Sequence, residues 1–446
     1  MNIELKAKEF AIKAHKGQVR KSDKEKPMII HPINVGQILK QYGFDENVVS
    51  AGYLHDVVED TSYEIEDIKD NFNDDIASLV YGASEPDKSL SWEERKKHTI
   101  EETKKLDLRH KAVICADKIS NLEDLKILFE IKGEYDFSAF KRGYESQKWY
   151  YTEVYNSLIF NEDENNPMFI RLKELIDEIF NNKDNDEYVK NIIFKDNIEE
   201  YNKLRKIHYR KEEVYKLKKV LSDNSLYVIE FTGTPRTGKT SLINNLKDFF
   251  KKKGFVVEVL EEFTTSEKYK KEIYPTLKDK YKNVVNTEIP KYVLKQLEES
   301  IEGKPDIIII DRSLFDRLIW VDRLYLKNGM SENEYSEYKK LYIPLIKNKI
   351  DIVISTYADS LTSLKRDYNA NLSLEKRSFL NETNLNEYNE SLLNMKKLSE
   401  EENINFNLFD TTNKNQREIS FEVVDCLLKD MRQNLLNKAY KEFDFK

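Results

Sequence analysis

Glycine and histidine are scarce in this chain of 446 residues. It has 12 glycines, where the usual share of about 7% would give roughly 30. It has six histidines, and five of them lie within the first 110 residues. Two of the glycines, Gly233 and Gly238, stand five positions apart. Scarce residues that cluster in this way indicate local chemistry.

Cysteine and long apolar runs are also nearly lacking. The two cysteines, Cys115 and Cys426, lie far apart in apolar segments, which excludes a disulfide framework and fits a reducing compartment. No stretch approaches the roughly 18 uncharged apolar residues of a membrane span, and the first residues do not resemble a signal peptide. We therefore expect a cytoplasmic protein that does not bind membranes.

Charge of one sign is not in large excess. Lys and Arg number 73 and Asp and Glu 81, so the formal net charge is −8. A net negative charge argues against non-specific binding to nucleic acids through counterion release, and we expect no specific nucleic-acid partner either.

The length predicts two or three domains at roughly 150 residues each. Residues 1–183 carry long helix-periodic apolar runs, which predict an all-α domain. Residues 184–223 are dense in charged residues and are interpreted as a solvated helical linker. Residues 224–446 alternate short β-branched runs with segments of helix length, which predicts an α/β domain with a parallel sheet.

The first cluster of chemistry is the adjacent pair His55 and Asp56, followed one turn later by Glu59 and Asp60. Carboxylates three and four positions apart share a helix face, and burying them beside a histidine is costly without a cation. His31 and Asp117 are the remaining candidate ligands. Mixed imidazole and carboxylate ligands suit Mn²⁺ or Fe²⁺, which would activate a water for hydrolysis of a phosphate ester or anhydride.

Three segments carry these residues in order: HKGQVRKSDKEKPMIIHP, AGYLHDVVEDT and ADKISNLEDL. Together they resemble the HD-type hydrolase domain of the RelA/SpoT alarmone enzymes, most closely the stand-alone small alarmone hydrolases, over about residues 5–155. The resemblance implies removal of pyrophosphate from the 3′ side of guanosine tetra- or pentaphosphate. It implies a Mn²⁺ ion held by His31, His55, Asp56 and Asp117, a water oriented or deprotonated by Glu59 and Asp60, and substrate contacts from Arg20, Lys21, Ser22 and Asn121.

One loop departs from that family. The family usually reads RKSGxPYIxHP, whereas this chain has KSDKEKPMIIHP, without the glycine and the tyrosine. The departure leaves the identity of the nucleotide open, and a hydrolase of other 3′-phosphorylated nucleotides such as NADPH is an alternative. No trace of the family's synthetase domain follows, so we expect no alarmone synthesis.

The second cluster is the sequence G-x-x-x-x-G-K-T between a predicted strand and an amphipathic helix, which is the context of a P-loop. Backbone N–H groups would surround the phosphates of ATP, Lys239 would reach the β and γ phosphates, and Thr240 would ligate Mg²⁺. Asp311 ends the apolar run DIIIID and is expected on the Mg²⁺ side of the loop. The predicted phosphate-binding residues are Gly233, Thr234, Pro235, Arg236, Thr237, Gly238, Lys239, Thr240 and Ser241.

The segment that begins DRSLFDRLIW resembles deoxynucleoside and thymidylate kinases. The resemblance implies that Glu262 is the base towards the acceptor hydroxyl and that Arg312 contacts substrate. It also implies a lid whose Lys365, Arg366 and Arg377 neutralise the transferring phosphate. The glutamate-proline pair after the second strand and the full arginine series of the lid are missing, which leaves the acceptor open.

Taken together, these patterns predict a bifunctional enzyme that acts on small-molecule nucleotides. A metal-dependent hydrolase would be joined to a kinase that uses ATP and Mg²⁺. The alternative is a regulatory or defence protein whose P-loop domain senses a nucleotide and gates the hydrolase. The sequence leaves the oligomeric state open, and a homo-oligomer is compatible with it.

Overall fold

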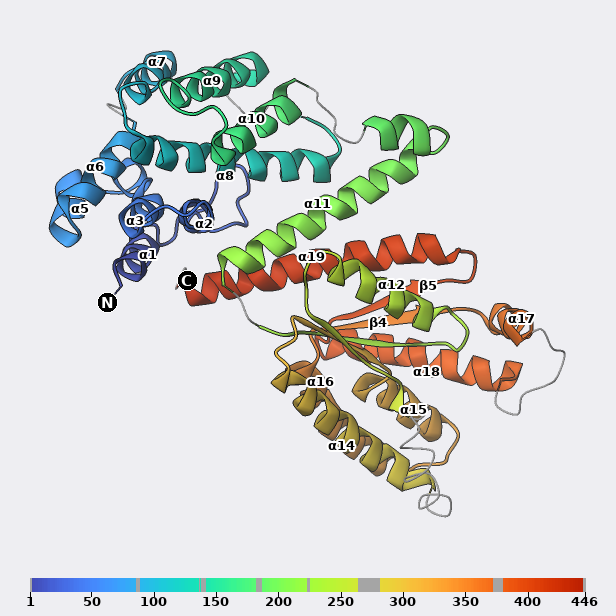
Figure 1. The fold of residues 1–446 in the computed structure, drawn as a ribbon. Coiled ribbons are helices and arrows are strands. Elements are labelled where there is room, and N and C mark those ends of the chain that lie inside the picture. The colour runs from blue at the N-terminus through green and yellow to red at the C-terminus, as the bar shows by residue number, and fades with distance from the viewer. Residues whose placement is uncertain are drawn as a thin grey trace. The chain divides into compact units, whose positions relative to one another are not determined.

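The computed structural model forms two compact units (Figure 1). One unit comprises Met1–Asp223 together with Leu428–Lys446, and the other comprises Asn224–Leu427. The structure describes residues 2–85, 89–135, 137, 142–181, 187–222, 225–263, 281–371 and 380–443. Within these ranges, no helix is both long enough and apolar enough to cross a membrane.

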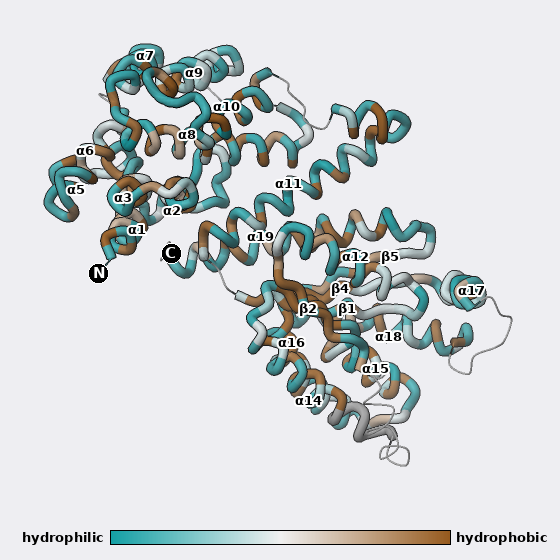
Figure 2. Tube along the Cα trace, in the orientation of Figure 1, coloured by the Kyte–Doolittle hydropathy of each residue, from teal (hydrophilic) through white to brown (hydrophobic). Residues whose placement is uncertain are grey.

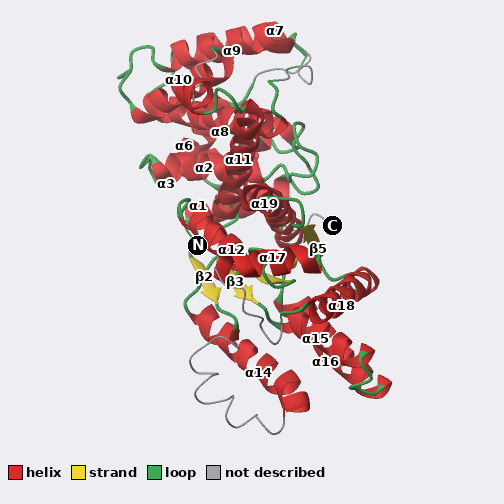
Figure 3. Cartoon of the chain, turned by 90° about the vertical axis from the view of Figure 1, so that its right-hand side faces the viewer, coloured by secondary structure: helices red, strands yellow, loops and turns green. Residues whose placement is uncertain are grey.

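The described part of the first unit is built from helices, and the predicted all-α fold is confirmed (Figure 3). Its chain order is α1 (Ile3–Ala14), α2 (Ile30–Gln41), α3 (Glu46–Leu54), α4 (Val57–Asp60), α5 (Ile65–Asn71), α6 (Asp74–Ala83), α7 (Trp92–Thr103), α8 (Leu108–Lys132), α9 (Gly143–Leu158), α10 (Pro167–Phe180), a π-helical turn η1 (Val189–Ile193) and α11 (Ile198–Val220).

The long helix α8 is the centre of this unit, and α2, α3, α6, α10 and α11 pack against it. Two of the scarce glycines bring α2 and α3 close together. A Cβ atom on Gly36 would lie 2.3 Å from the ring of Tyr53, and one on Gly52 would lie 2.5 Å from the side chain of Leu39. This close approach places His31, in the first turn of α2, near His55, which caps the end of α3.

The expected linker is helical, but it is not a solvated connection. Helix α11 buries an apolar stripe that includes Ile207, Val214 and Leu217, and it packs against α8 and α2. Its Arg205 also pairs with Glu130 of α8. Charged residues cover the exposed face of α11, which is why its composition suggested a linker, whereas its buried stripe makes it part of the first unit.

The second unit is an α/β fold around a five-stranded parallel sheet in the order β2-β3-β1-β4-β5, which confirms the predicted class. The tube is strongly apolar around β1 and β2 (Figure 2), and β3 reads IIIID. They are β1 (Tyr227–Gly233), β2 (Val257–Leu260), β3 (Ile307–Asp311), β4 (Ile352–Tyr357) and β5 (Phe406–Asp410). The helices are α12 (Lys239–Lys251), α14 (Tyr281–Glu302), α15 (Leu314–Leu326), α16 (Glu332–Lys349), α17 (Ser360–Asn371), α18 (Glu382–Glu401) and α19 (Gln416–Glu442).

The strand order reverses its direction of growth at β1, which lies between β3 and β4. Ligands of open parallel sheets bind at the carboxyl ends of strands where this happens. Gly233 ends β1 and Asp311 ends β3, so both P-loop candidates lie at that edge.

Helix α19 contributes to both units. Its residues up to Leu427 group with the second unit, whereas those from Leu428 group with the first. The sequence placed 224–446 in one domain, so the last part of that range groups elsewhere in the structure.

Candidate metal and nucleotide sites

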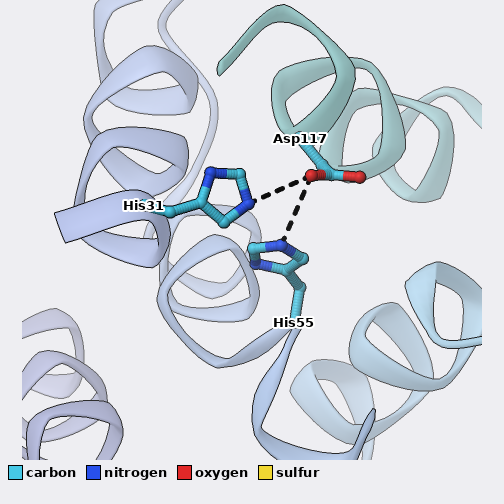
Figure 4. A group of neighbouring side chains, drawn as sticks. All are labelled: His31, His55 and Asp117. Carbon is cyan, nitrogen blue, oxygen red and sulfur yellow. Dashed lines mark hydrogen bonds and ion pairs between the residues drawn. The ribbon is translucent and has the colours of Figure 1, made fainter. Parts of the chain in front are cut away.

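His31, His55 and Asp117 converge in the first unit, from α2, the end of α3 and α8 (Figure 4). Asp117 Oδ1 lies 3.1 Å from His31 Nε2 and 3.7 Å from His55 Nε2. Asp56, which precedes α4, joins them: its carboxylate oxygens lie 3.5 Å from His31 Nε2 and 3.2 Å from His55 Nε2. All four predicted ligands therefore meet at one point.

The outer nitrogens of the two rings are held in place. His31 Nδ1 lies 3.0 Å from Ser120 Oγ, and His55 Nδ1 lies 2.9 Å from the carbonyl oxygen of Gly52. Both Nε2 atoms consequently face the carboxylates. Such outer contacts fix the orientation of metal-binding histidines.

These donors fit a divalent cation. His55 Nε2 is buried and faces the carboxylates of Asp56 and Asp117, but within the described part of the chain none of its contacts has the geometry of a hydrogen bond. Burial lowers the pKa of His55, but Asp56 and Asp117 outweigh burial and raise it to about 9. Burial and the Arg20 guanidinium lower the pKa of His31 to about 4. The carboxylates of Asp56 and Asp117 therefore lie close together in a buried site, where they favour a positive charge on His55 while His31 is neutral at pH 7. A divalent cation bound between these groups would supply the positive charge that the two carboxylates favour.

Arg20 is tied to this cluster through Asn121. Arg20 Nη2 donates to Asn121 Oδ1 at 2.8 Å, and Asn121 Nδ2 donates to Asp117 Oδ1 at 2.6 Å. Lys21 and Ser22 are exposed on the following loop. The structure therefore brings Arg20 and Asn121 to the metal candidates and leaves Lys21 and Ser22 on the surface beside them.

Glu59 and Asp60 lie on the short helix α4, directly after Asp56. Burial and the neighbouring acids Asp56 and Glu85 raise the pKa of Glu59. The Glu59 carboxylate accepts a hydrogen bond of 3.4 Å from the backbone N–H of Glu85, and the backbone carbonyl of Asp60 accepts one of 2.8 Å from Gln18 Nε2.

Sequence reasoning missed three kinds of residue around this site. Ser120 is one turn after Asp117 on α8, so helix periodicity would have found it. Lys118 pairs with Asp117 Oδ2 at 2.6 Å. Arg95 and Lys96 of α7 pair with Glu85, and no pattern within α7 signals this contact.

The predicted P-loop runs from the end of β1 to the start of α12 and needs both of its glycines. Gly233 has φ 131° and a Cβ there would lie 2.0 Å from the carbonyl oxygen of Thr356. Gly238 has φ 87° and caps α12. Arg236 also has a positive φ, of 65°, and its Nε lies 2.6 Å from Asp367 of α17.

The remaining residues of the loop divide by exposure. Lys239 is buried and its Nζ pairs with Asp311 at the end of β3, so the two side chains meet at the P-loop. Thr237 is buried and its hydroxyl donates to the Thr234 carbonyl at 2.9 Å. Thr240 and Ser241 are exposed at the first turn of α12, and Pro235 is half-buried.

Arg312 lies among acids beside the loop. Its Nη1 pairs with Asp316 Oδ1 at 2.8 Å, its Nε lies 3.5 Å from Glu262 Oε2, and its Nη2 donates to the Gly233 carbonyl at 3.0 Å. The predicted base Glu262 and substrate contact Arg312 are thus neighbours of the P-loop. Arg312 itself has φ 62°.

No sequence motif points to the role of Glu230, a buried acid in the middle of β1. It accepts hydrogen bonds from the backbone N–H groups of Ser313, Phe315 and Asp316 and from the Ser313 hydroxyl, at 2.7–3.0 Å. The carboxylate thereby caps the start of α15 and fixes the segment that follows Asp311.

The predicted lid is described only in part. Arg366 of α17 donates to the Thr411 side chain at 2.9 Å and to the Thr411 carbonyl at 2.6 Å, so it holds the segment after β5. Lys365 is exposed. Arg377 lies outside the described residues.

Comparisons with known proteins match the two units separately. Residues 7–132 match the model of the HD domain family, and residues 228–359 match that of an AAA domain. The Drosophila melanogaster guanosine-3′,5′-bis(diphosphate) 3′-pyrophosphohydrolase is 41% identical over 121 residues, 27% of this chain and 67% of that protein.

Solved structures also match parts of the chain. A Listeria monocytogenes protein of known crystal structure is 43% identical and covers 34% of this chain and 94% of its own, with a TM-score of 0.32. A deoxyadenosine kinase from M. mycoides with bound dATP is 20% identical and covers 46% of this chain and 99% of its own, also with a TM-score of 0.32.

Proposed function

Because the chain belongs, through its N-terminal part, to the HD-domain family that includes guanosine-3′,5′-bis(diphosphate) 3′-pyrophosphohydrolases, we propose that its first unit hydrolyses (p)ppGpp-like nucleotides. The observation that supports this most is the convergence of His31, His55 and Asp117, with Arg20 linked to Asp117 through Asn121. Water would add to the 3′ α-phosphorus, pyrophosphate would leave from the 3′ oxygen, and with ppGpp the second product would be GDP.

The residues divide this work as follows. His31, His55, Asp56 and Asp117 would hold the cation, for which we propose Mn²⁺. When bound, this ion supplies a water of lowered pKa. Glu59 is poised to accept the proton because its own pKa is raised, and Asp60 would orient the same water. Arg20 would pack against the base, with Lys21 and Ser22 reaching the phosphates or ribose.

For the second unit we propose transfer of the γ-phosphate of ATP to a nucleoside or nucleotide. The support is that Lys239 and Asp311 meet at the end of β3, with Glu262 beside Arg312. The loop amides and Lys239 would bind the phosphates, Thr240 and Asp311 would hold Mg²⁺, and Glu262 would accept the proton of the acceptor hydroxyl.

One pair of variants tests both proposals. His55→Ala should reduce release of pyrophosphate from ppGpp with Mn²⁺ to below about 1% of wild type, because it removes a ligand of the cation. Lys239→Ala should abolish phosphorylated product from ATP and a panel of nucleosides and nucleotides, because it removes a cation from the phosphates. Each variant should retain the other activity, measured by chromatography of the products.

His98→Ala, an exposed histidine on α7, is the matched control and should leave both activities unchanged. If the wild-type protein turns over neither ppGpp nor ATP with the panel, both proposals fail. Hydrolysis of NADPH in place of ppGpp would contradict the proposed nucleotide. Loss of both activities from either single change would favour the gated alternative, in which the P-loop domain controls the hydrolase.

A further inference from the structure

Arg432, in the part of α19 that belongs to the first unit, makes ion pairs with three carboxylates. Its Nε lies 2.8 Å from Glu213 Oε1 of α11, its Nη1 lies 2.7 Å from Glu25 Oε2, and its Nη2 pairs with Asp23. The Arg432 side chain is only 16% exposed. Each guanidinium nitrogen serves a different partner, which the single ammonium of a lysine does not reproduce.

Two of these carboxylates, Asp23 and Glu25, lie in the loop that leads from Ser22 to His31. Asp23 and Glu25 fall within the stretch that departs from the family's RKSGxPYIxHP pattern, and Arg432 lies far outside the residues that match the HD domain. The part of the loop that differs from the family pattern is therefore the part that pairs with α19, a helix outside the matched HD domain.

The base of this loop, Arg20 and Lys26, is closed by a hydrogen bond and an ion pair, whereas its tip, residues 22–25, borders a cavity. The backbone N–H of Arg20 donates to the carbonyl of Lys26 at 2.9 Å, and Lys26 Nζ pairs with Asp124 at 3.2 Å. A cavity of about 430 Å³ lies against Ser22, Asp23, Glu25 and Lys26 on one side and against α8, α11 and α19 on the other. Beside this cavity, the ion pairs of Arg432 join Asp23 and Glu25 to α19.

We propose that Arg432 is a positioning residue for the nucleotide-binding loop of the HD site, so that the C-terminal helix completes that site. The inference rests on the proposed hydrolase function. Asp23 directly follows Lys21 and Ser22, so a displaced tip displaces the two exposed side chains that would contact the nucleotide. The candidate metal ligands are on α2, α3, α4 and α8 and do not depend on the tip.

The test compares full-length Arg432→Gln with Arg417→Gln, an exposed arginine on the same helix. Arg432→Gln should raise KM for ppGpp about tenfold and change kcat less than about twofold, because it weakens binding and leaves the reacting groups in place. The KM of Arg432→Lys should lie between those of wild type and Arg432→Gln, because a lysine replaces only part of the three-way pairing. Affinity for Mn²⁺, measured by calorimetry, should not change in any of the three.

A second readout does not depend on the reaction. Limited trypsin digestion should cut Arg432→Gln faster after Lys21 and Lys24 than it cuts wild type or Arg417→Gln, because the freed tip opens more often. This arm keeps its meaning even if the protein does not hydrolyse ppGpp, so failure of the positioning role and failure of the proposed function are distinguishable.

The loop double variant Asp23→Asn/Glu25→Gln guards against misfolding, since it leaves the pair between Arg432 and Glu213 intact. It should raise KM and loop cleavage as Arg432→Gln does. Unchanged KM and unchanged cleavage in both variants would overturn the proposal, as would a fall in kcat with KM unaltered.

Discussion

Asp124 of α8 forms ion pairs with two lysines from separate parts of the first unit. Lys26 Nζ of the loop lies 3.2 Å away and Lys216 Nζ of α11 lies 2.9 Å away. Burial alone would raise the pKa of Asp124, but Lys216 and Lys26 outweigh it and hold the pKa well below its usual range. The carboxylate thus joins three elements around the cavity.

We expect Asp124→Asn to lower the free energy of unfolding of the first unit at pH 7 by about 3 kcal/mol, because it removes a carboxylate from two largely buried lysines, of which Lys216 keeps its pair with Glu123 at 3.3 Å. Denaturant unfolding measures this. Asp75→Asn is the matched control: Asp75 likewise pairs with a basic residue, Arg109, but 39% of its side chain is exposed, so the loss should be about 0–1 kcal/mol.

The pH dependence of this difference has a definite sign. The folded pKa of Asp124 lies below the unfolded value of about 3.9, so its contribution is fully present above that value and is lost as pH falls through the folded pKa. The difference in free energy of unfolding between wild type and Asp124→Asn should therefore shrink steadily as the pH falls below about 4. A constant difference down to pH 2 would contradict the assignment.

At the scale of elements, Glu230 decides where α15 begins. The buried carboxylate accepts three backbone N–H groups and one hydroxyl across the end of β3. Glu230→Gln keeps the shape but places an amide N–H₂ against some of these donors. We expect a loss of about 2–4 kcal/mol in the stability of the second unit, measured by thermal or denaturant unfolding.

Glu258→Gln on β2 is the comparison for this change. Glu258 is half-buried and accepts one hydrogen bond of 2.8 Å, from Ser300, so its substitution should cost much less. Equal losses from the two variants would mean that Glu230 does not cap α15 as described.

The elements also show what the sequence could predict. The five strands were predictable because each is a short apolar run between longer segments, and His31, His55 and Asp117 because three motifs carry them in order. The packing of α11 was not predictable, although Ile207, Val214 and Leu217 repeat at helical spacing. The surfaces that bury these residues belong to α8 and α2, and the sequence of α11 does not show that they are there. Arg366 was predicted to contact the transferring phosphate, whereas in the structure it contacts Thr411. That contact depends on how the segment after β5 folds, which the residues around Arg366 do not indicate.

At the scale of the whole molecule, the first unit depends on residues that follow the second. Besides Arg432, the buried residues of this last segment are Leu435, Leu436 and Ala439 of α19 and Phe443, which follows the helix. A chain that stops after Leu427 should lose stability in its first unit and bind ppGpp more weakly, while binding of ATP to the second unit should persist. Domain-resolved unfolding and calorimetry with both nucleotides would measure this, and wild-type KM in the shortened chain would contradict it.

The shared helix α19 has a consequence for how this protein is made. A ribosome releases the chain from its N-terminus, so the HD unit emerges without the segment that holds its loop and receives that segment only after Asn224–Leu427 has been synthesised. At about 5–20 residues per second, this interval lasts about 10–40 s. A nascent chain therefore carries its candidate metal ligands long before it carries Arg432, and a ribosome that stalls within the second unit leaves the HD unit unfinished.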